Sequence, residues 1–170
     1  MMIFSKSIAL ILALALSACG FTPMYAEKPN SVTVTEHFDH IEIAPIADRL
    51  GQKVHNGLLD QITPYGASSS PRYKLLVTLS EDLQGFGFRE DESITRQNFR
   101  LNAHYELRNI DTMSLMTQGD VSSNMAFDVV QSDFANHSAF EDARSRTAEQ
   151  VVATLVLRLG SYFQTLPDGS

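Results

Sequence analysis

The feature that most constrains the fold is a strict alternation of apolar and polar residues between positions 98 and 108. The apolar members of this alternation are Phe99, Leu101, Ala103, Tyr105 and Leu107. Successive side chains of a β-strand point to opposite faces of the sheet, so a period of two predicts a strand with one buried and one wet face. The fold is therefore expected to contain a sheet that is covered on one side only.

Similar alternations precede and follow this segment. Residues 73–79 alternate with Leu76 as the one interruption, and the strand is expected to continue toward Phe86 and Phe88 past a glycine kink. Residues 115–129 alternate as well, and the short link at 109–114 predicts that the last two strands are antiparallel neighbours in a meander. A less regular pattern at 38–43 predicts a first strand.

Two segments carry apolar residues at spacings of three and four, which predicts amphipathic helices. In the first helix these residues are Ala47, Leu50, Val54, Leu58 and Ile62, and in the second they are Ala143, Thr147, Val151, Leu155 and Leu159. The sequence from Ser138 to Glu141 is a capping box and predicts the start of the second helix. Gly51 and Gly57 each cost the first helix about 1 kcal/mol relative to Ala, so that helix must depend on packing.

Together these elements predict an α+β fold with the order β-α-β-β-β-α. Two amphipathic helices would cover one face of a four-stranded, antiparallel-rich mixed sheet and form a two-layer sandwich. The other sheet face would be polar and open. Water alone can cover such a face, and a docking surface for a polar partner, such as the lumen of an outer-membrane β-barrel, is the alternative interpretation.

The single cysteine, Cys19, directly follows a short apolar stretch at residues 8–16. Lys6 precedes this stretch and small residues precede the cysteine, as in a bacterial lipobox. A membrane-spanning helix needs about 20 apolar residues, so the stretch is too short to be one. We expect residues 1–18 to be a lipoprotein signal peptide and Cys19 to carry diacylglycerol and, on its amine, an acyl chain such as palmitate. The alternative is a plain secretory signal with an incidental cysteine.

The remaining chain divides into three parts. Residues 19–36 contain two prolines and no clear period, which is typical of a tether, residues 37–166 would form one α+β domain, and 167–170 would be a C-terminal tail. The formal net charge is −7. Proteins that bind nucleic-acid phosphates concentrate Lys and Arg, so we expect no nucleic-acid partner.

Three segments resemble the family of LPS-assembly lipoproteins, LptE. They are the run Cys19-Gly20-Phe21-Thr22-Pro23-Met24-Tyr25, the stretch Ile94-Thr95-Arg96 leading into Ala103-His104-Tyr105-Glu106-Leu107, and the run from Phe134-Ala135 to Asp142-Ala143. The resemblance covers the chain from Cys19 onward and includes the order of elements. It implies a lipid-anchored outer-membrane subunit that acts as plug and assembly partner of the LptD β-barrel and helps deliver lipopolysaccharide to the outer leaflet. Gly20 in place of Asp after the cysteine also favours the outer membrane.

The resemblance further implies that basic side chains at one end of the sheet contact lipopolysaccharide, whose phosphates and carboxylates pair well with a guanidinium group. Arg89 matches such a position, with Arg96 and Arg100 as neighbours in the sequence. The acidic run at 90–92 leaves open a second interpretation, in which these arginines only balance nearby charge. A second basic position of the family, near the last helix, has no counterpart here, because Ala-Asn-His occupies 135–137.

Signals for catalysis are weak. His37 and His40 form a His-x-x-His pair, but a metal site needs a third ligand that the sequence does not offer, so both are expected to be surface histidines. The sequence has no Gly-x-Ser-x-Gly elbow and no phosphate-binding glycine loop. We expect a binding and assembly subunit that is not an enzyme and has no catalytic residues, metal or cofactor.

A lipoprotein subunit of another envelope lipid-transport system, such as an ABC-transporter auxiliary lipoprotein, is the alternative function. Such proteins can share a lipobox and a small α/β domain. The partner distinguishes the two, because one binds an outer-membrane barrel and the other an inner-membrane or periplasm-spanning complex.

Overall fold

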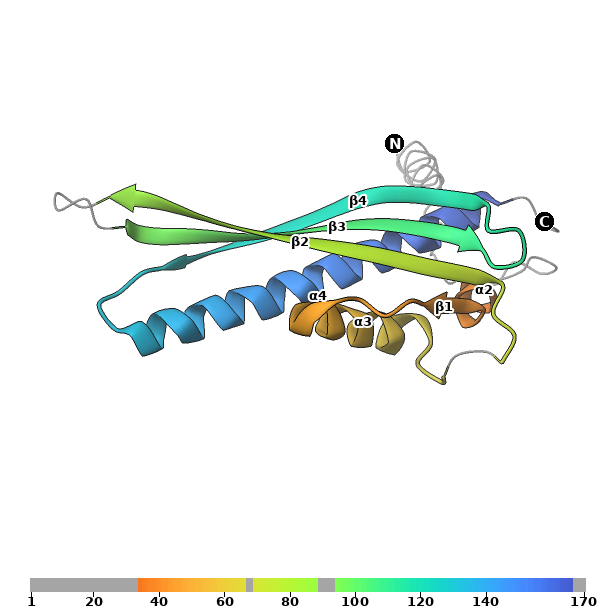
Figure 1. Ribbon diagram of the computed structural model, residues 1–170, viewed down its shortest axis with the longest axis horizontal. Helices are drawn as coiled ribbons and strands as arrows, with labels where there is room; N and C mark the ends of the chain where they lie inside the picture. The colour runs from red at the N-terminus through yellow and green to blue at the C-terminus, as the bar shows by residue number, and fades with distance from the viewer. Residues whose placement is uncertain (1–33, 67–68, 89–93, 167–170) are drawn as a thin grey trace, which may run out of the picture.

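The computed structural model describes residues 34–66, 69–88 and 94–166, and it has the predicted α+β architecture. The elements follow the order α2 (Val34–Asp39), β1 (Ile41–Ile43), α3 (Asp48–Ile62), β2 (Tyr73–Phe88), β3 (Ile94–Asn109), β4 (Leu115–Asp128) and α4 (Asp133–Thr165). Figure 1 shows α4 running along one face of a long sheet, with α3 beside it. The predicted signal peptide (1–18), Cys19, the tether up to residue 33, Arg89 and the tail (167–170) lie outside the described residues.

The four strands form one mixed sheet with the order β1-β2-β3-β4. Strands β2, β3 and β4 are consecutive antiparallel neighbours, which confirms the predicted meander. Strand β1 is parallel to β2, and α3 forms the crossover between them. Strand β2 reaches Phe88, as the continuation past the glycine kink predicted.

The core lies between the sheet and α4. On β3 the alternating apolar residues are all buried, as predicted, and they face the α4 stripe from Ala143 to Leu159, which is buried as well. Thr147, the one polar member of the stripe, is fully buried and its hydroxyl donates to the Ala143 carbonyl at 2.6 Å. A buried hydroxyl without a partner would be costly, and this bond to the preceding helical turn removes that cost.

The expected strand at 38–43 is only partly correct. Residues 41–43 form β1, but Phe38 lies in the short helix α2, which also contains residues 34–36 of the expected tether. Val34, His37 and Phe38 are buried on one side of this helix. Phe38 meets Phe163 of α4 edge-on at 6.0 Å between ring centroids, so packing against the end of α4 stabilises a helix too short to form alone.

The predicted start of the last helix at Ser138 is wrong, because α4 begins at Asp133. The hydroxyl of Ser132 caps the helix by accepting a hydrogen bond from the Ala135 amide at 3.4 Å. The Asn136 side chain bonds both the N–H and the C=O of Val130, at 2.9 and 2.8 Å, and so sets the direction in which the chain enters the helix. These contacts start the helix earlier than the capping box does.

Two further positions differ from the pattern. Ala47 is the exposed N-cap of α3 and is not on its buried face. A bulge between Leu107 and Arg108 leaves Met116 without a partner in the ladder, so Leu115 pairs with Arg108 on the open side of the sheet and is 45% exposed. A bulge shifts the alternation by one residue, which explains why Leu115 leaves the apolar face.

The two glycines of α3 lie at close contacts, one with α4 and one with the segment before the helix. A Cβ atom on Gly57 would lie 3.2 Å from Val152 of α4, and one on Gly51 would lie 3.0 Å from the backbone of Ile46. Both glycines thus lower the intrinsic stability of the helix but permit close packing. This agrees with the prediction that the helix depends on packing.

Gly119 of β4 lies under the ring of its cross-strand partner Tyr105, and a Cβ atom there would be 3.0 Å from the phenol oxygen and 3.1 Å from Cε1. We expect Gly119→Val to lower the free energy of unfolding by about 1–3 kcal/mol, because overpacking outweighs the better strand propensity of Val. Urea unfolding measures this. Ser122→Val, at an exposed position of the same strand, is the control and should change stability by less than about 0.5 kcal/mol.

His37 is buried, which corrects the expectation that it lies on the surface. Its ring stacks on Phe163 at 4.7 Å, and its Nδ1 atom lies 2.9 Å from the Tyr73 hydroxyl. Burial lowers the pKa of His37 below its ordinary value of 6.5; Glu36 raises this pKa, whereas Arg72 and His40 lower it. The folded protein therefore disfavours a charged imidazole at this position.

Because the pKa of His37 is lower in the folded than in the unfolded chain, unfolding takes up a proton below about pH 6.5. We expect the free energy of unfolding to fall as the pH drops from 7.5 to 5.5, and His37→Phe, which keeps the ring stack, to flatten this dependence. Urea titrations at several pH values measure both. His137→Gln, at an exposed position of α4, should keep the wild-type slope; an unchanged slope in His37→Phe would contradict the assignment.

Candidate interaction surface

The sheet face opposite α4, called the open face from here on, is rich in polar groups. It consists of the side chains that alternate with the buried ones on β2, β3 and β4. Its polar members are Lys74, Thr78, Ser80, Asp82 and Gln84 on β2, Arg96, Asn98, Arg100, Asn102, His104, Glu106 and Arg108 on β3, and Gln118, Asp120, Ser122, Asn124 and Asp128 on β4. The predicted polar face is therefore present over three long strands.

Ion pairs cover the part of the open face near the β3–β4 turn. The Arg108 guanidinium donates to Glu106 Oε2 from two nitrogens, at 2.9 and 2.7 Å. His104 lies between two carboxylates, with Nδ1 2.9 Å from Asp120 and Nε2 3.8 Å from Glu106. These polar groups contact one another, so this part of the face is mainly self-paired.

The middle of the open face carries uncharged hydrogen-bonding groups. Ser80, Asn102 and Ser122 lie opposite one another across the three strands. The Asn124 side-chain nitrogen donates to Asn98 Oδ1 at 3.1 Å. Amides and hydroxyls of this kind both donate and accept, so they can bind another polar surface without a fixed charge pattern.

Two of the three candidate arginines lie together at the far end of this face. Arg96 and Arg100 are exposed and belong to the same face of β3, where they alternate with buried Phe99 and half-buried Gln97. Arg96 makes only a long ion pair with Asp128, at 3.7 Å, and both side chains are more than half exposed. Among the described residues no ion pair involves Arg100, whose neighbours across the sheet are Asp82 and Asn124. The arginines at this end are therefore less tightly paired than Arg108 at the other end.

One charged contact was not predicted. Arg144 of α4 donates to both carboxylate oxygens of Glu81 on β2, at 3.0 Å each, and to Glu141 at 3.2 Å. The hydrogen bonds that Arg144 donates to Glu81 are the main cause that raises the pKa of Arg144. The sequence contained a signal for this contact, because Glu81 takes a position on the apolar face of β2, between Leu79 and Leu83. This contact joins α4 to β2 on the covered side of the sheet.

The histidine pair does not form a metal site. His37 Nδ1 faces the Tyr73 hydroxyl, whereas His40 Nδ1 lies 2.9 Å from the Ser70 carbonyl oxygen. In the part of the chain that the structure describes, no three His, Cys, Asp or Glu side chains are grouped so that they could hold a metal ion.

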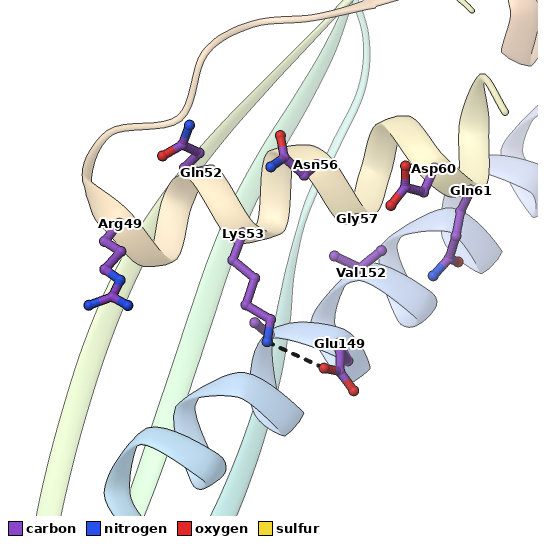
Figure 2. A pocket seen from close by; sticks show the side chains of 10 residues that line it. Arg49, Gln52, Lys53, Asn56, Gly57, Asp60, Gln61, Glu149 and Val152 are labelled. Atoms are coloured by element: carbon purple, nitrogen blue, oxygen red, sulfur yellow. Dashed lines mark ion pairs between the residues drawn. The ribbon is translucent and has the colours of Figure 1, made fainter. Parts of the chain in front are cut away.

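A groove of ≈ 470 Å³ lies between α3 and α4 on the side away from the sheet (Figure 2). Gly57 and Val152 line it where the helices approach each other, and polar side chains of α3 form one wall. Figure 2 shows the Lys53 ammonium reaching across to Glu149, a contact of 3.4 Å. Because Lys53 is already paired with Glu149, the groove does not indicate a particular class of ligand.

No helix within residues 34–66, 69–88 and 94–166 is both long and apolar enough to cross a membrane. No protein-family model matches the chain, and no curated protein matches its sequence.

Solved structures of low sequence identity have a similar fold. A candidate lipoprotein from Caulobacter crescentus CB15 superposes with a TM-score of 0.62 at 18% identity, over 78% of this chain and 97% of the other. A minor lipoprotein from Acinetobacter baumannii gives a TM-score of 0.59 at 10% identity, over 77% and 96%. The rare lipoprotein B from Shewanella oneidensis gives 0.50 at 6% identity, over 69% and 94%. These similarities establish the fold.

Proposed function

We propose that this chain is an outer-membrane lipoprotein of the lipopolysaccharide transport machinery. Anchored through Cys19, it would act in the manner of LptE as plug and assembly partner of an LptD-like β-barrel and help deliver lipopolysaccharide to the outer leaflet. It would work by binding, as a subunit that is not an enzyme.

Two observations support a lipoprotein of the Gram-negative envelope. The sequence places its single cysteine at the end of a lipobox. The three similar structures are named as lipoproteins and come from Gram-negative bacteria. The outer membrane and the lipopolysaccharide machinery follow from the resemblance to LptE.

The observation that carries the plug role is the open face. The lumen of a large outer-membrane barrel is lined by polar side chains, and a partner inside it must offer hydrogen bonds and charges of both signs. The open face does this along three strands, with self-paired charges near the β3–β4 turn, uncharged groups such as Asn98 and Ser122 in the middle, and Arg96 and Arg100 at the far end.

Affinity purification of the tagged, lipidated chain from gently solubilised outer membranes tests this function. We expect an outer-membrane barrel protein to co-purify in a one-to-one ratio, identified by mass. Co-purification with an inner-membrane transporter would instead support an auxiliary lipoprotein of another lipid-transport system. A chain that purifies alone would contradict both assignments.

The arginine end of the open face generates a second prediction. Arg96 and Arg100 are exposed and weakly paired, so they can donate to phosphates at little cost. We expect the double variant Arg96→Glu, Arg100→Glu to weaken binding of purified lipopolysaccharide by about 10–100-fold, since the two exposed contacts, screened by solvent, together contribute about 1.4–2.8 kcal/mol. Arg89→Asp, next to the same end in the sequence, should weaken it in the same direction.

Arg49→Glu is the matched control, because Arg49 lies on α3 beside the groove and away from the open face. It changes the net charge by the same amount per residue and should leave binding unchanged. Equal loss in the control would mean that only the overall charge matters, and an unaffected double variant would rule out this end as the lipid contact.

A further inference from the structure

Helix α2 joins the N-terminal segment that carries Cys19 to the domain, and few contacts hold it. It has six residues, of which Val34, His37 and Phe38 are buried, at 8%, 7% and 2% exposure. Two apolar side chains and one imidazole must therefore offset the ordering of a helix that is too short to form alone. Docking of α2 on the domain is thus only marginally stable.

The sheet contacts of the next segment do not depend on α2. The His40 carbonyl accepts hydrogen bonds from the Arg72 and Tyr73 amides, at 2.9 and 3.1 Å, and Ile41–Ile43 pair with β2. Toward α2, the His40 amide donates to the His37 carbonyl at 3.2 Å. Helix α2 can therefore leave the domain while β1 stays paired.

His37 is at the centre of the docked contact. Its ring lies nearly parallel to that of Phe163 on α4, at 4.7 Å and 6°, and 5.8 Å from the ring of Tyr73 on β2. Phe38 meets the same Phe163 ring edge-on. Tyr162, the titratable neighbour of Phe163, stays neutral because burial raises its pKa. The imidazole is thus enclosed by uncharged rings from α4 and β2.

The charged groups around His37 come from α2 and from the chain next to β1 and β2. Burial is the largest effect and lowers the pKa of His37; Glu36 raises this pKa, and Arg72 and His40 lower it. Among the described residues no charged group of α3 or α4 affects it. The Tyr73 hydroxyl can donate or accept, so it fits either form of the ring. Burial is therefore what disfavours the imidazolium.

We propose that α2 is a latch that opens in acid, in which protonation of His37 releases α2 from Phe163 and Tyr73 while β1 and the rest of the sheet stay folded. A charged imidazole is stable in water and unstable in this enclosed site, so acid favours the released form. Release frees the six residues of α2 together with His40. When extended, they lengthen the tether by about 24 Å.

The direction of the pH dependence follows from the two forms of the latch. The pKa of His37 lies below 6.5 when α2 is docked and close to 6.5 when it is released. Docking is therefore fully stable above pH 6.5 and weakens as the pH falls toward the pKa of the docked form. Between the two pKa values, each pH unit shifts the equilibrium up to about tenfold toward release. The opening itself is independent of the proposed function, and the longer tether matters for a chain anchored through Cys19.

Nuclear magnetic resonance of the ¹⁵N-labelled mature chain, with Cys19→Ser, tests the proposal between pH 7.5 and 5.0. We expect the ¹H–¹⁵N nuclear Overhauser effect of the α2 amides to fall as His37 titrates, because released residues move on the nanosecond timescale. The amides of Leu101 and its neighbours on β3 should keep rigid values.

Two variants separate His37 from its surroundings. His37→Phe keeps a ring on Phe163 but cannot be charged, so its α2 amides should stay rigid at every pH. His40→Gln is the matched control and should still release α2, at a slightly higher pH, because His40 lowers the pKa of His37.

Three results would overturn the proposal. One is a helix α2 that stays rigid while the His37 ring signals titrate. Another is release that coincides with loss of the β3 signals, because that is unfolding of the whole domain. The third is release of α2 in His37→Phe at the wild-type pH, which would assign the effect to another group.

Discussion

The packing of α4 against the buried face of β3 and β4 is the interaction on which the rest of the structure depends. Phe99, Leu101 and Leu107 on β3 and Leu155 and Leu159 on α4 are all 0–1% exposed. Burying a side chain of this size stabilises a fold by about 1.5–3 kcal/mol. With its single cysteine at position 19 the chain can form no internal disulfide, so this core supplies most of the stability.

The other elements are held through α4. Helix α3 packs on it where Gly57 meets Val152, and α2 packs on it where His37 and Phe38 meet Phe163. Both are weak helices by themselves, one because of its glycines and one because of its length. The same helix reaches β2 through the pair of Arg144 with Glu81. One long helix thus organises the whole covered side of the sheet.

A sheet covered on one side has two kinds of surface left for partners. The open face presents side chains, and its chemistry changes from self-paired charges around Glu106 to arginines at Arg96 and Arg100. The outer edge of β2 presents backbone groups, whose recognition depends on strand direction and register and only secondarily on side chains. The two surfaces therefore differ in the groups they present, side chains on the open face and backbone N–H and C=O groups at the edge.

Local sequence pattern determined the strands β2, β3 and β4, the helices α3 and α4, their buried faces and the open polar face. A period of two residues in the apolar pattern identifies the strands and a period of 3.6 identifies the helices, because each long element must bury one apolar side. Arg96 and Arg100 lie on the same face of β3, because a spacing of four residues in a strand preserves the side. Their contact with lipopolysaccharide stays a prediction.

Tertiary structure alone decided the features that depend on contacts between distant residues. Helix α2 forms because Phe163 packs against it, α4 starts early because Asn136 bonds Val130, and a bulge at Leu107 and Arg108 turns Leu115 outward. The free edge of β2 exists because β1 stops after three residues. The periodicity of the sequence indicates which side of an element is buried. Tertiary packing alone sets which partner buries that side and over what length.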